Sequence, residues 1–426
     1  MTRYIGLCLF LLISFNQSQA QELQAIPVVG LQFNGLKKTK TSHLNNYLRT
    51  KDLSTINADD IAEYAKKLRM LNSILDVSYS IDTIKAGQVL QFDIKEAATL
   101  FPIINFGGIR DNLWFQLGLT DINWLGRGIQ LTAFYQNTDN RSNYNIYYRV
   151  PYISGSKWGF SLSATRFASV EPLYFDEEPV FYRYTNNSYA ASLLYEFQIG
   201  HSLELGFNYF IEQYEKDEEQ VLQQTPGPDN ARLPKWLGKI GHRLSDVEYN
   251  FYHRDGFDNT LLLQSVYNTT DGSWFFIMLD NFVYHKTYSP KSELGLRLRL
   301  GLSSNDNTPF APFVLDSNLN IRGSGNRIDR GTAQLVLNLE YRYSIWDKQQ
   351  LPLAVQAVVF SDIGTWRNPG GRLGDLWLRE NFRHFAGLGF RLIYKKAYNA
   401  IFRVDYGVDI YNIEERGFVI GIGQFF

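Results

Sequence analysis

From about residue 102 to residue 426, apolar and polar residues alternate along segments that turn-forming residues separate. Between residues 293 and 302, leucine fills every even position, whereas Glu293, Arg297, Arg299 and two glycines fill the odd positions. Because successive side chains of a β-strand point to opposite faces, this alternation predicts strands with one apolar and one polar face. Two fold classes fit: a soluble sandwich with the apolar face inside, and a membrane barrel with the apolar face outside.

The lengths of the connections separate these two classes. The pattern predicts about 16 strands of roughly ten residues each. The connections on one side are all short and the four long ones fall on the opposite side, as in outer-membrane barrels. A soluble sandwich has no reason to sort its loops by length. The short connections are residues 125–127, 153–157, 200–202, 254–259, 288–291, 347–350 and 395–399, and the long ones are residues 168–188, 216–237, 303–331 and 363–385. The sequence therefore favours a transmembrane β-barrel.

Composition agrees with a folded β-protein. Aromatic residues make up 15% of the chain, and charged residues make up 20%. No run of about 18 apolar residues, the length that a transmembrane helix needs, occurs in the sequence. Disordered chains are poor in aromatic and β-branched residues, so disorder is excluded as well. The net charge of -1 gives no indication of a nucleic-acid partner.

The amino terminus predicts export. Residues 1–20 combine an early Arg3, an apolar stretch and a small residue, Ala20, before the predicted cleavage point. We interpret this segment as a secretory signal peptide, so the mature chain is expected to be exported. The only cysteine, Cys8, lies inside the segment, so no disulfide or thiol chemistry is expected in the mature protein.

Residues 21–98 follow a different pattern, which predicts a small α+β domain. A β-rich stretch at 26–33 precedes a short helix at 41–48 and a second helix that Asn57 caps. Two strands at 75–82 and 89–96 complete the order β-α-α-β-β. The barrel would then occupy residues 99–426.

Motifs for catalysis are sparse. The six histidines are scattered without metal-ligand spacing, and no nucleophile elbow, phosphate loop or zinc-binding helix motif occurs. We therefore expect no enzyme activity, no metal and no cofactor. An enzymatic or structural barrel that uses its external loops stays open as a further alternative.

Alternation also predicts which polar side chains point into the lumen. Asn338, Glu340 and Arg342 lie opposite the apolar face of one strand, and Asp362 lies opposite that of the next. If the connection 303–331 folds inward, Arg322 can pair with Asp362 or Glu340, since a guanidinium matches carboxylate geometry. On spacing alone, an ordinary exposed arginine is the other interpretation.

Five motifs in order make the mature chain resemble the BamA/TamA superfamily of outer-membrane assembly and translocation factors. These proteins join periplasmic POTRA domains to a 16-stranded barrel, and the short amino-terminal domain here resembles one POTRA domain. The motifs are Val29-Gly30-Leu31-Gln32-Phe33-Asn34-Gly35, Asn123-Trp124-Leu125-Gly126-Arg127-Gly128, Arg322-Gly323, Phe360-Ser361-Asp362-Ile363-Gly364, and the last nine residues, Phe418 to Phe426.

The resemblance implies three groups of site residues. A loop lock would comprise Arg322, Gly323, Glu340, Asp362 and Gly364. A lateral seam between the first and last barrel strands would involve Gly107, Gly108, Gly421 and Gly423. A terminal β-signal would comprise Phe418, Ile420, Ile422 and Phe426.

The implied function is insertion or translocation of polypeptides at the outer membrane. The partners would be unfolded outer-membrane or exported polypeptides and outer-membrane lipids, with periplasmic chaperones or accessory lipoproteins as further partners. The amino-terminal domain would lie in the periplasm. A passive pore and a two-partner-type secretion channel are the alternative functions.

Overall fold

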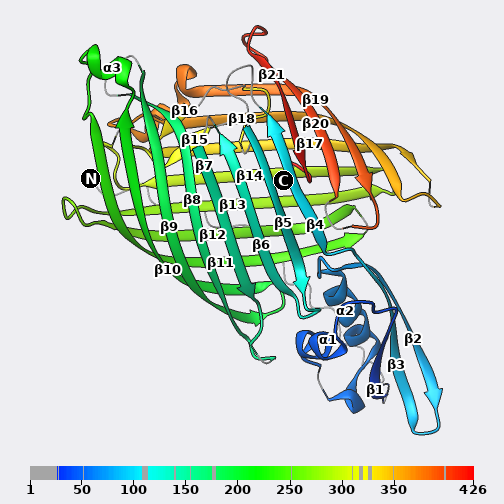
Figure 1. Ribbon diagram of the computed structural model, residues 1–426. Helices are drawn as coiled ribbons and strands as arrows, with labels where there is room; N and C mark the ends of the chain where they lie inside the picture. The colour runs from blue at the N-terminus through cyan, green and yellow to red at the C-terminus, as the bar shows by residue number, and fades with distance from the viewer. Residues whose placement is uncertain are drawn as a thin grey trace, which may run out of the picture.

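The structure is a computed structural model that describes residues 26, 28–50, 52–107, 114–138, 141–153, 155–174, 179–250, 252–308, 310–315, 320–324, 329–348, 350–397 and 400–426. The expected signal peptide, residues 1–20, lies outside these residues. Two bodies are visible: a large barrel, and a small amino-terminal domain below one end of it (Figure 1). No helix within the described ranges is long and apolar enough to cross a membrane.

The barrel is one antiparallel sheet of 16 strands, which confirms the predicted fold class. Consecutive strands are hydrogen-bonded neighbours throughout, and β14 pairs with β17 across an inserted segment. The strands are β4 (Leu100–Gly107), β5 (Trp114–Trp124), β6 (Ile129–Thr138), β7 (Arg141–Val150), β8 (Trp158–Tyr174), β9 (Pro179–Gln198), β10 (His201–Lys216), β11 (Asn230–Asn250), β12 (His253–Asn268), β13 (Trp274–Ser289), β14 (Ser292–Ser303), β17 (Ala333–Asp347), β18 (Leu353–Arg367), β19 (Phe382–Tyr394), β20 (Ile401–Asp409) and β21 (Arg416–Ile422).

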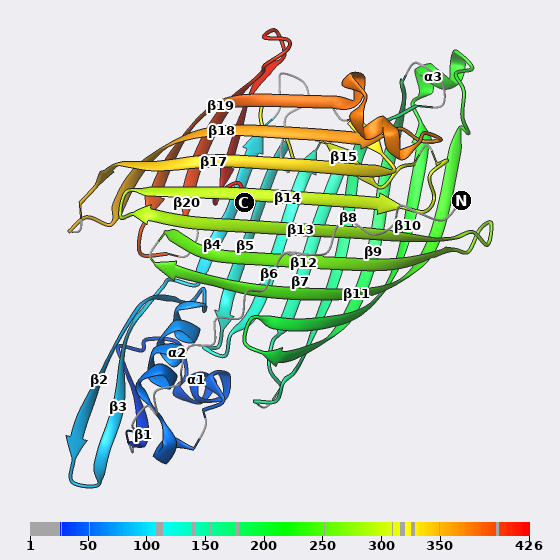
Figure 2. The same ribbon diagram turned by 180° about the vertical axis from the view of Figure 1, so that it is seen from behind.

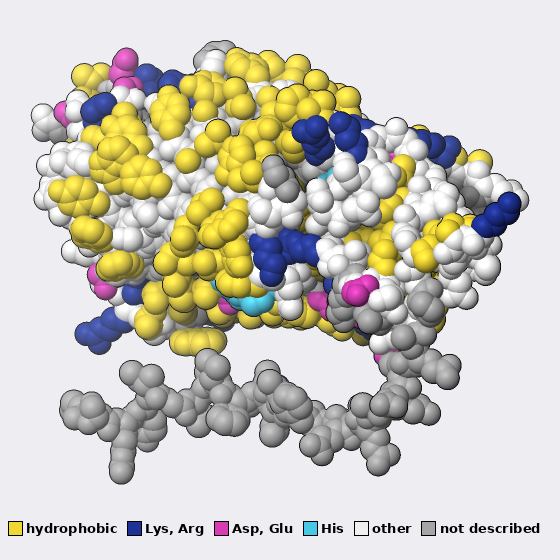
Figure 3. Space-filling view, turned by 90° about the horizontal axis from the view of Figure 1, so that it is seen from below, with side chains coloured by type: hydrophobic (Ala, Val, Ile, Leu, Met, Phe, Trp, Pro, Cys, Tyr) yellow, Lys and Arg dark blue, Asp and Glu magenta, His cyan; other side chains and the backbone are white. Residues whose placement is uncertain are grey.

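The alternating pattern determines which face of each strand meets the lumen. On β17, Leu339 and Tyr341 are exposed on the outer surface, whereas Asn338, Glu340 and Arg342 are completely buried inside. Apolar side chains accordingly gather over broad areas of the outer surface (Figure 3). An apolar exterior around a polar interior is the arrangement that a lipid bilayer requires.

Two expectations about strand and loop lengths are wrong. The strands from β8 to β13 contain 16 to 21 residues each, well beyond the expected ten. Most of the expected loop 168–188 is a paired extension of β8 and β9, and their register continues from Trp158↔Tyr195 to Tyr174↔Pro179. The membrane limits only the apolar part of a strand, so pairing continues beyond the alternating apolar pattern that defined the predicted boundaries.

Other connections also contain regular structure. The connection after β10 holds the short helix α3 (Glu218–Leu222), and the one after β18 holds the turns η2 (Leu373–Trp377) and η3 (Arg379–Asn381). The segment between β14 and β17 forms a two-stranded ribbon of β15 (Phe313–Leu315) and β16 (Asp329–Gly331).

The amino-terminal domain has the predicted order of elements. Its helices pack on a three-stranded sheet of order β1-β3-β2, in which β1 runs parallel to β3. Asn57 and Asp60 form a capping box that starts the second helix. The elements are β1 (Val28–Asn34), α1 (Thr41–Leu48), η1 (Leu53–Thr55), α2 (Ala58–Arg69), β2 (Ile74–Ile84) and β3 (Gly87–Glu96).

The hairpin of β2 and β3 extends past the helices and points away from the barrel (Figures 1 and 2). The buried residues of α1, α2 and β3 form one apolar core. By contrast, every residue of β2 from Ser78 to Ile84 is exposed. This end of the domain therefore presents an uncovered strand edge.

Candidate functional site

The inserted segment between β14 and β17 folds into the lumen and places Arg322 in its centre. Arg322 has no exposed surface, and its guanidinium donates to both carboxylate oxygens of Asp362 at 2.8 and 2.9 Å. A third guanidinium nitrogen donates to Glu340 at 2.5 Å. Asp362 also accepts the backbone N–H of Arg322 at 2.9 Å, so this carboxylate fixes both the side chain and the loop.

Further charges surround this pair. Arg342 bridges Glu340 and Glu293, and Arg391 forms a two-pronged pair with Asp405 at 2.7 and 3.2 Å. The side chains of these residues have no exposed surface. We call Arg322, Glu340, Asp362, Arg342 and Glu293 the lumen cluster. It joins the inserted segment to three wall strands, β14, β17 and β18.

Two of the predicted glycines allow the loop to approach the wall. Gly323 adopts a left-handed backbone conformation, φ +96°, and a side chain there would meet the backbone of Gly407 on β20. A side chain at Gly364 would collide with Ile321 and Leu315 of the inserted segment. The predicted residues Arg322, Gly323, Glu340, Asp362 and Gly364 are thus all in one place.

The chain after β21 departs from the expected strand. β21 ends at Ile422, and Gly423, with φ +90°, turns the following residues out of the sheet and into the lumen. Phe425 exposes only 7% of its surface. Phe426 stacks on His285 with ring centroids 6.2 Å apart, and its carbonyl accepts from Arg342 at 3.1 Å.

Of the four residues of the expected terminal β-signal, only the first three therefore belong to a strand. Phe418, Ile420 and Ile422 do alternate on the exposed face of β21, but Phe426 lies inside the barrel among charged groups. The reason is that arginines of the lumen wall offer cation–π and hydrogen-bonding partners that an extended strand would not reach.

The barrel is incompletely closed between its first and last strands. Every other pair of neighbouring strands is hydrogen-bonded, but no ladder joins β4 to β21 within the described residues. Each of these strands is short, with 8 and 7 residues, and Pro102 of β4 cannot donate to a ladder. Gly107, Gly421 and Gly423 lie in or next to these strands, while Gly108 is outside the described residues. We call this gap the seam.

The amino-terminal domain docks on the short turns of the barrel. The carboxylate of Glu96 accepts three consecutive backbone N–H groups, from Lys37, Lys38 and Thr39, and so shapes the segment before α1. Asn123, near the end of β5 and just before the β5–β6 turn, donates to the Thr39 hydroxyl at 2.8 Å. This turn is the predicted Asn-Trp-Leu-Gly-Arg-Gly motif, and its position at the junction could not be read from the sequence.

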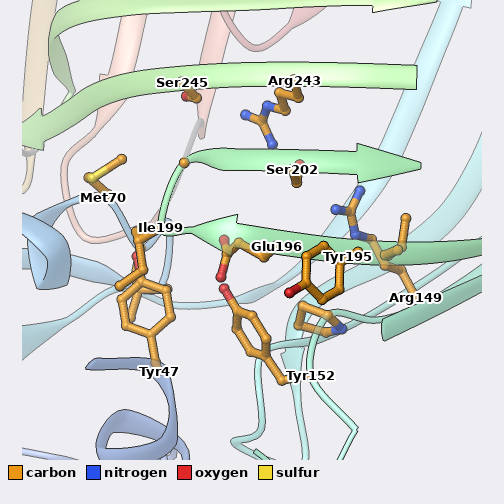
Figure 4. A pocket seen from close by; sticks show the side chains of 14 residues that line it. Tyr47, Met70, Arg149, Tyr152, Tyr195, Glu196, Ile199, Ser202, Arg243 and Ser245 are labelled. Carbon is orange, nitrogen blue, oxygen red and sulfur yellow. The ribbon is translucent and has the colours of Figure 1, made fainter. Parts of the chain in front are cut away.

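Four ion pairs add to the junction, and in each the cation belongs to the domain. They are Lys38–Asp121, Arg49–Glu196, Lys66–Asp246 and Arg69–Glu248, at 2.6 to 3.1 Å. A small cavity of about 180 Å³ lies beside the second pair. In it the Tyr152 hydroxyl and the Glu196 carboxylate point toward each other, below Arg149 and Arg243 (Figure 4).

Comparison with known proteins gives this arrangement a family. The Omp85 superfamily domain matches residues 123–426. The chain belongs to the Omp85 superfamily. A search of curated proteins finds no significant match to the sequence.

Solved structures of Omp85 type share the fold. BamA from Haemophilus ducreyi lacking POTRA domains 1-3 is 17% identical with a TM-score of 0.54, over 94% of this chain and 83% of that one. CdiB from Escherichia coli is 10% identical with a TM-score of 0.62, over 93% and 76%. CdiB from Acinetobacter baumannii is 13% identical with a TM-score of 0.57, over 94% and 74%. The protein thus shares the barrel fold of these structures and belongs to the superfamily through residues 123–426.

In this Omp85 protein, the first prediction concerns His43 at the junction. His43 packs against Tyr47, Tyr152 and the Gly128 turn, and burial lowers its pKa from 6.5 to about 4. The unfolded chain therefore binds a proton between these pH values that the folded domain does not. Stability should fall as pH drops from 6.5 toward 4, by up to about 1.4 kcal/mol per pH unit.

Denaturant unfolding of the amino-terminal domain in the full-length protein measures this slope. His43→Gln keeps a polar side chain without a titratable group. The slope of its unfolding free energy against pH should therefore be smaller, by the contribution of about one bound proton. Equal slopes for the two proteins would contradict the assignment to His43.

The second prediction concerns the lumen cluster. Arg322→Ala leaves Asp362 as a buried carboxylate without its arginine and removes one of the two arginines that contact Glu340, which costs about 3–5 kcal/mol. We expect a lower unfolding temperature of the barrel in lipid vesicles and faster proteolysis of residues 304–331. Arg372→Ala, which removes an exposed loop arginine, is the control and should leave both unchanged. Normal proteolysis of the Arg322→Ala segment would show that the ion pairs do not hold it.

Proposed function

We propose that the protein inserts or exports a restricted set of polypeptides at the outer membrane, and that the seam is where a client strand meets the barrel. The observation that carries this proposal is the lack of a ladder between β4 and β21 within the described residues, in a sheet where all other neighbours pair. Unpaired backbone groups at a strand edge are a template for another strand. No covalent chemistry is needed.

The weakness of β4 supports the same role. Its eight residues include Pro102, which lacks the N–H that a ladder needs. Leu100 and Ile104 expose 59% and 50% of their surface on the outside. A client strand that enters here can pair with the edge of β4 while its apolar side chains face lipid.

The amino-terminal domain is a single POTRA-like domain, and we place it in the periplasm. The ends of the barrel strands that contact it carry the short turns, which face the periplasm in outer-membrane barrels. Its exposed β2 edge carries Tyr79, Ile81 and Ile84, each with more than a third of its surface exposed. An extended client can add to this edge by main-chain hydrogen bonds, with its side chains on the exposed apolar residues.

A passive pore fits the lumen less well. The described part of the inserted segment contacts the lumen wall, and the charged side chains of the lumen cluster and of the Arg391–Asp405 pair have no exposed surface. A permanently open channel would keep such groups hydrated. We infer that the inserted segment acts as a lock whose release accompanies transport.

Depletion of the protein followed by quantification of the outer-membrane proteome tests the proposed function. We expect a selective decrease of several barrels or surface proteins while total outer-membrane protein changes little. Complementation with the wild-type chain should restore them. An unchanged proteome, together with a large conductance of the purified protein in planar bilayers, would support the passive pore instead.

Cysteine pairs across the seam test the site. Asn105→Cys with Gly421→Cys is the first pair of a panel between β4 and β21. A crosslink should decrease complementation about tenfold or more, and a reductant should restore it. The matched control joins Val408→Cys of β20 to Arg416→Cys of β21, partners within an existing ladder, and should leave function intact. Full function with the seam crosslinked would show that it need not open.

A further inference from the structure

Phe425 joins the strand at the seam to the central arginine of the lumen. The Arg322 guanidinium carbon lies 3.8 Å from the ring centroid of Phe360 and 4.3 Å from that of Phe425. The guanidinium therefore has an aromatic ring from β18 and another from the segment that follows β21. Cation–π attraction is strongest at such desolvated positions.

The same ring collects two other arginines. Arg297 of β14 and Arg403 of β20 lie 5.0 and 5.1 Å from its centroid. The preceding residue, Gln424, accepts from Arg391 at 3.1 Å through its side chain and from Arg403 at 2.9 Å through its carbonyl. These contacts all come from the inserted segment and from the wall on the β20 side of the seam.

The backbone explains why β21 and Phe425 move together. Between β21 and Phe425 lie only Gly423 and Gln424, and the Gly423 N–H donates to the Ile401 carbonyl at 2.7 Å. On its other edge, β21 has no ladder with β4 within the described residues. The position of the β21 end is thus set by its pairing with β20 and by the buried ring.

We propose that Phe425 is a positioning residue that couples the seam to the lumen cluster. Displacement of the β21 end withdraws the ring from Arg322, and displacement of Arg322 with its segment removes the ring's central cation. The seam and the inserted segment then change together between two arrangements, one with the Phe425 ring on Arg322 and one with the ring withdrawn. A change at the seam or at the inserted segment shifts the balance between the two. The functional meaning of this coupling rests on the proposed function, but the coupling itself is a property of the folded barrel.

Amide hydrogen exchange of residues 416–422 in the full-length protein, reconstituted in lipid nanodiscs, measures the coupling. Phe425→Leu keeps an apolar side chain but removes the aromatic face, and we expect these amides to exchange about tenfold faster, as for the loss of one desolvated cation–π contact. Phe425→Trp keeps the face and should stay within about twofold of wild type.

Arg322→Lys tests the link from the other side, because an ammonium keeps the charge but not the flat guanidinium. We expect it also to accelerate exchange of residues 416–422, and we expect the double variant with Phe425→Leu to be no faster than either single variant. Phe275→Leu is the matched control, since it removes a cation–π contact, with Lys235, from β13 rather than from the chain after β21. It should change exchange in β21 by less than about twofold.

The coupling would be overturned if Phe425→Leu left the exchange of residues 416–422 unchanged. It would also be overturned if the rate increases of Phe425→Leu and Arg322→Lys multiplied in the double variant. If Phe425→Leu does not assemble, unchanged β21 exchange in Arg322→Lys overturns it equally. The measurement needs no client. A normal outer-membrane proteome after depletion would therefore refute the proposed function without affecting this result, and the reverse also holds.

Discussion

The buried contact of Arg322 with Asp362 and Glu340 is the interaction on which the interior of this barrel depends. A guanidinium without exposed surface is stable only when carboxylates compensate its charge, and here they come from two adjacent wall strands. The contact holds the inserted segment in the lumen. It also positions Arg322 between two aromatic rings, one of which belongs to the chain after β21.

The outer wall follows from a simpler constraint. Every strand must present apolar side chains to lipid and polar ones to the lumen, so a polar interior is unavoidable in a barrel of this size. The interior polar groups then need partners, and the inserted segment and the residues after β21 supply them. The ion pairs of the lumen, the inward turn at Gly423 and the lack of a β4–β21 ladder within the described residues are therefore parts of one arrangement.

The junction with the amino-terminal domain adds a second fixed point. One wall of the seam, β4 with β5, is tied to the domain through Lys38, Thr39 and the β5–β6 turn. The other wall, β21, is tied to the lumen through Gln424 and Phe425. The two walls of the seam are therefore held by different contacts.

Local periodicity determined the strand number, the lumenal faces and the order of elements in the amino-terminal domain, because side-chain alternation and helix capping are properties of short segments. The pairing of Arg322 with Asp362 and Glu340 was open on spacing alone, since it depended on the inserted segment folding inward. Only the tertiary structure decided the lengths of β8 to β13, the docking of the 123–128 turn and the inward course of Phe425 and Phe426. Those features depend on partners distant in sequence, as the contacts of Phe425 and Phe426 with arginines of β14 and β17 show.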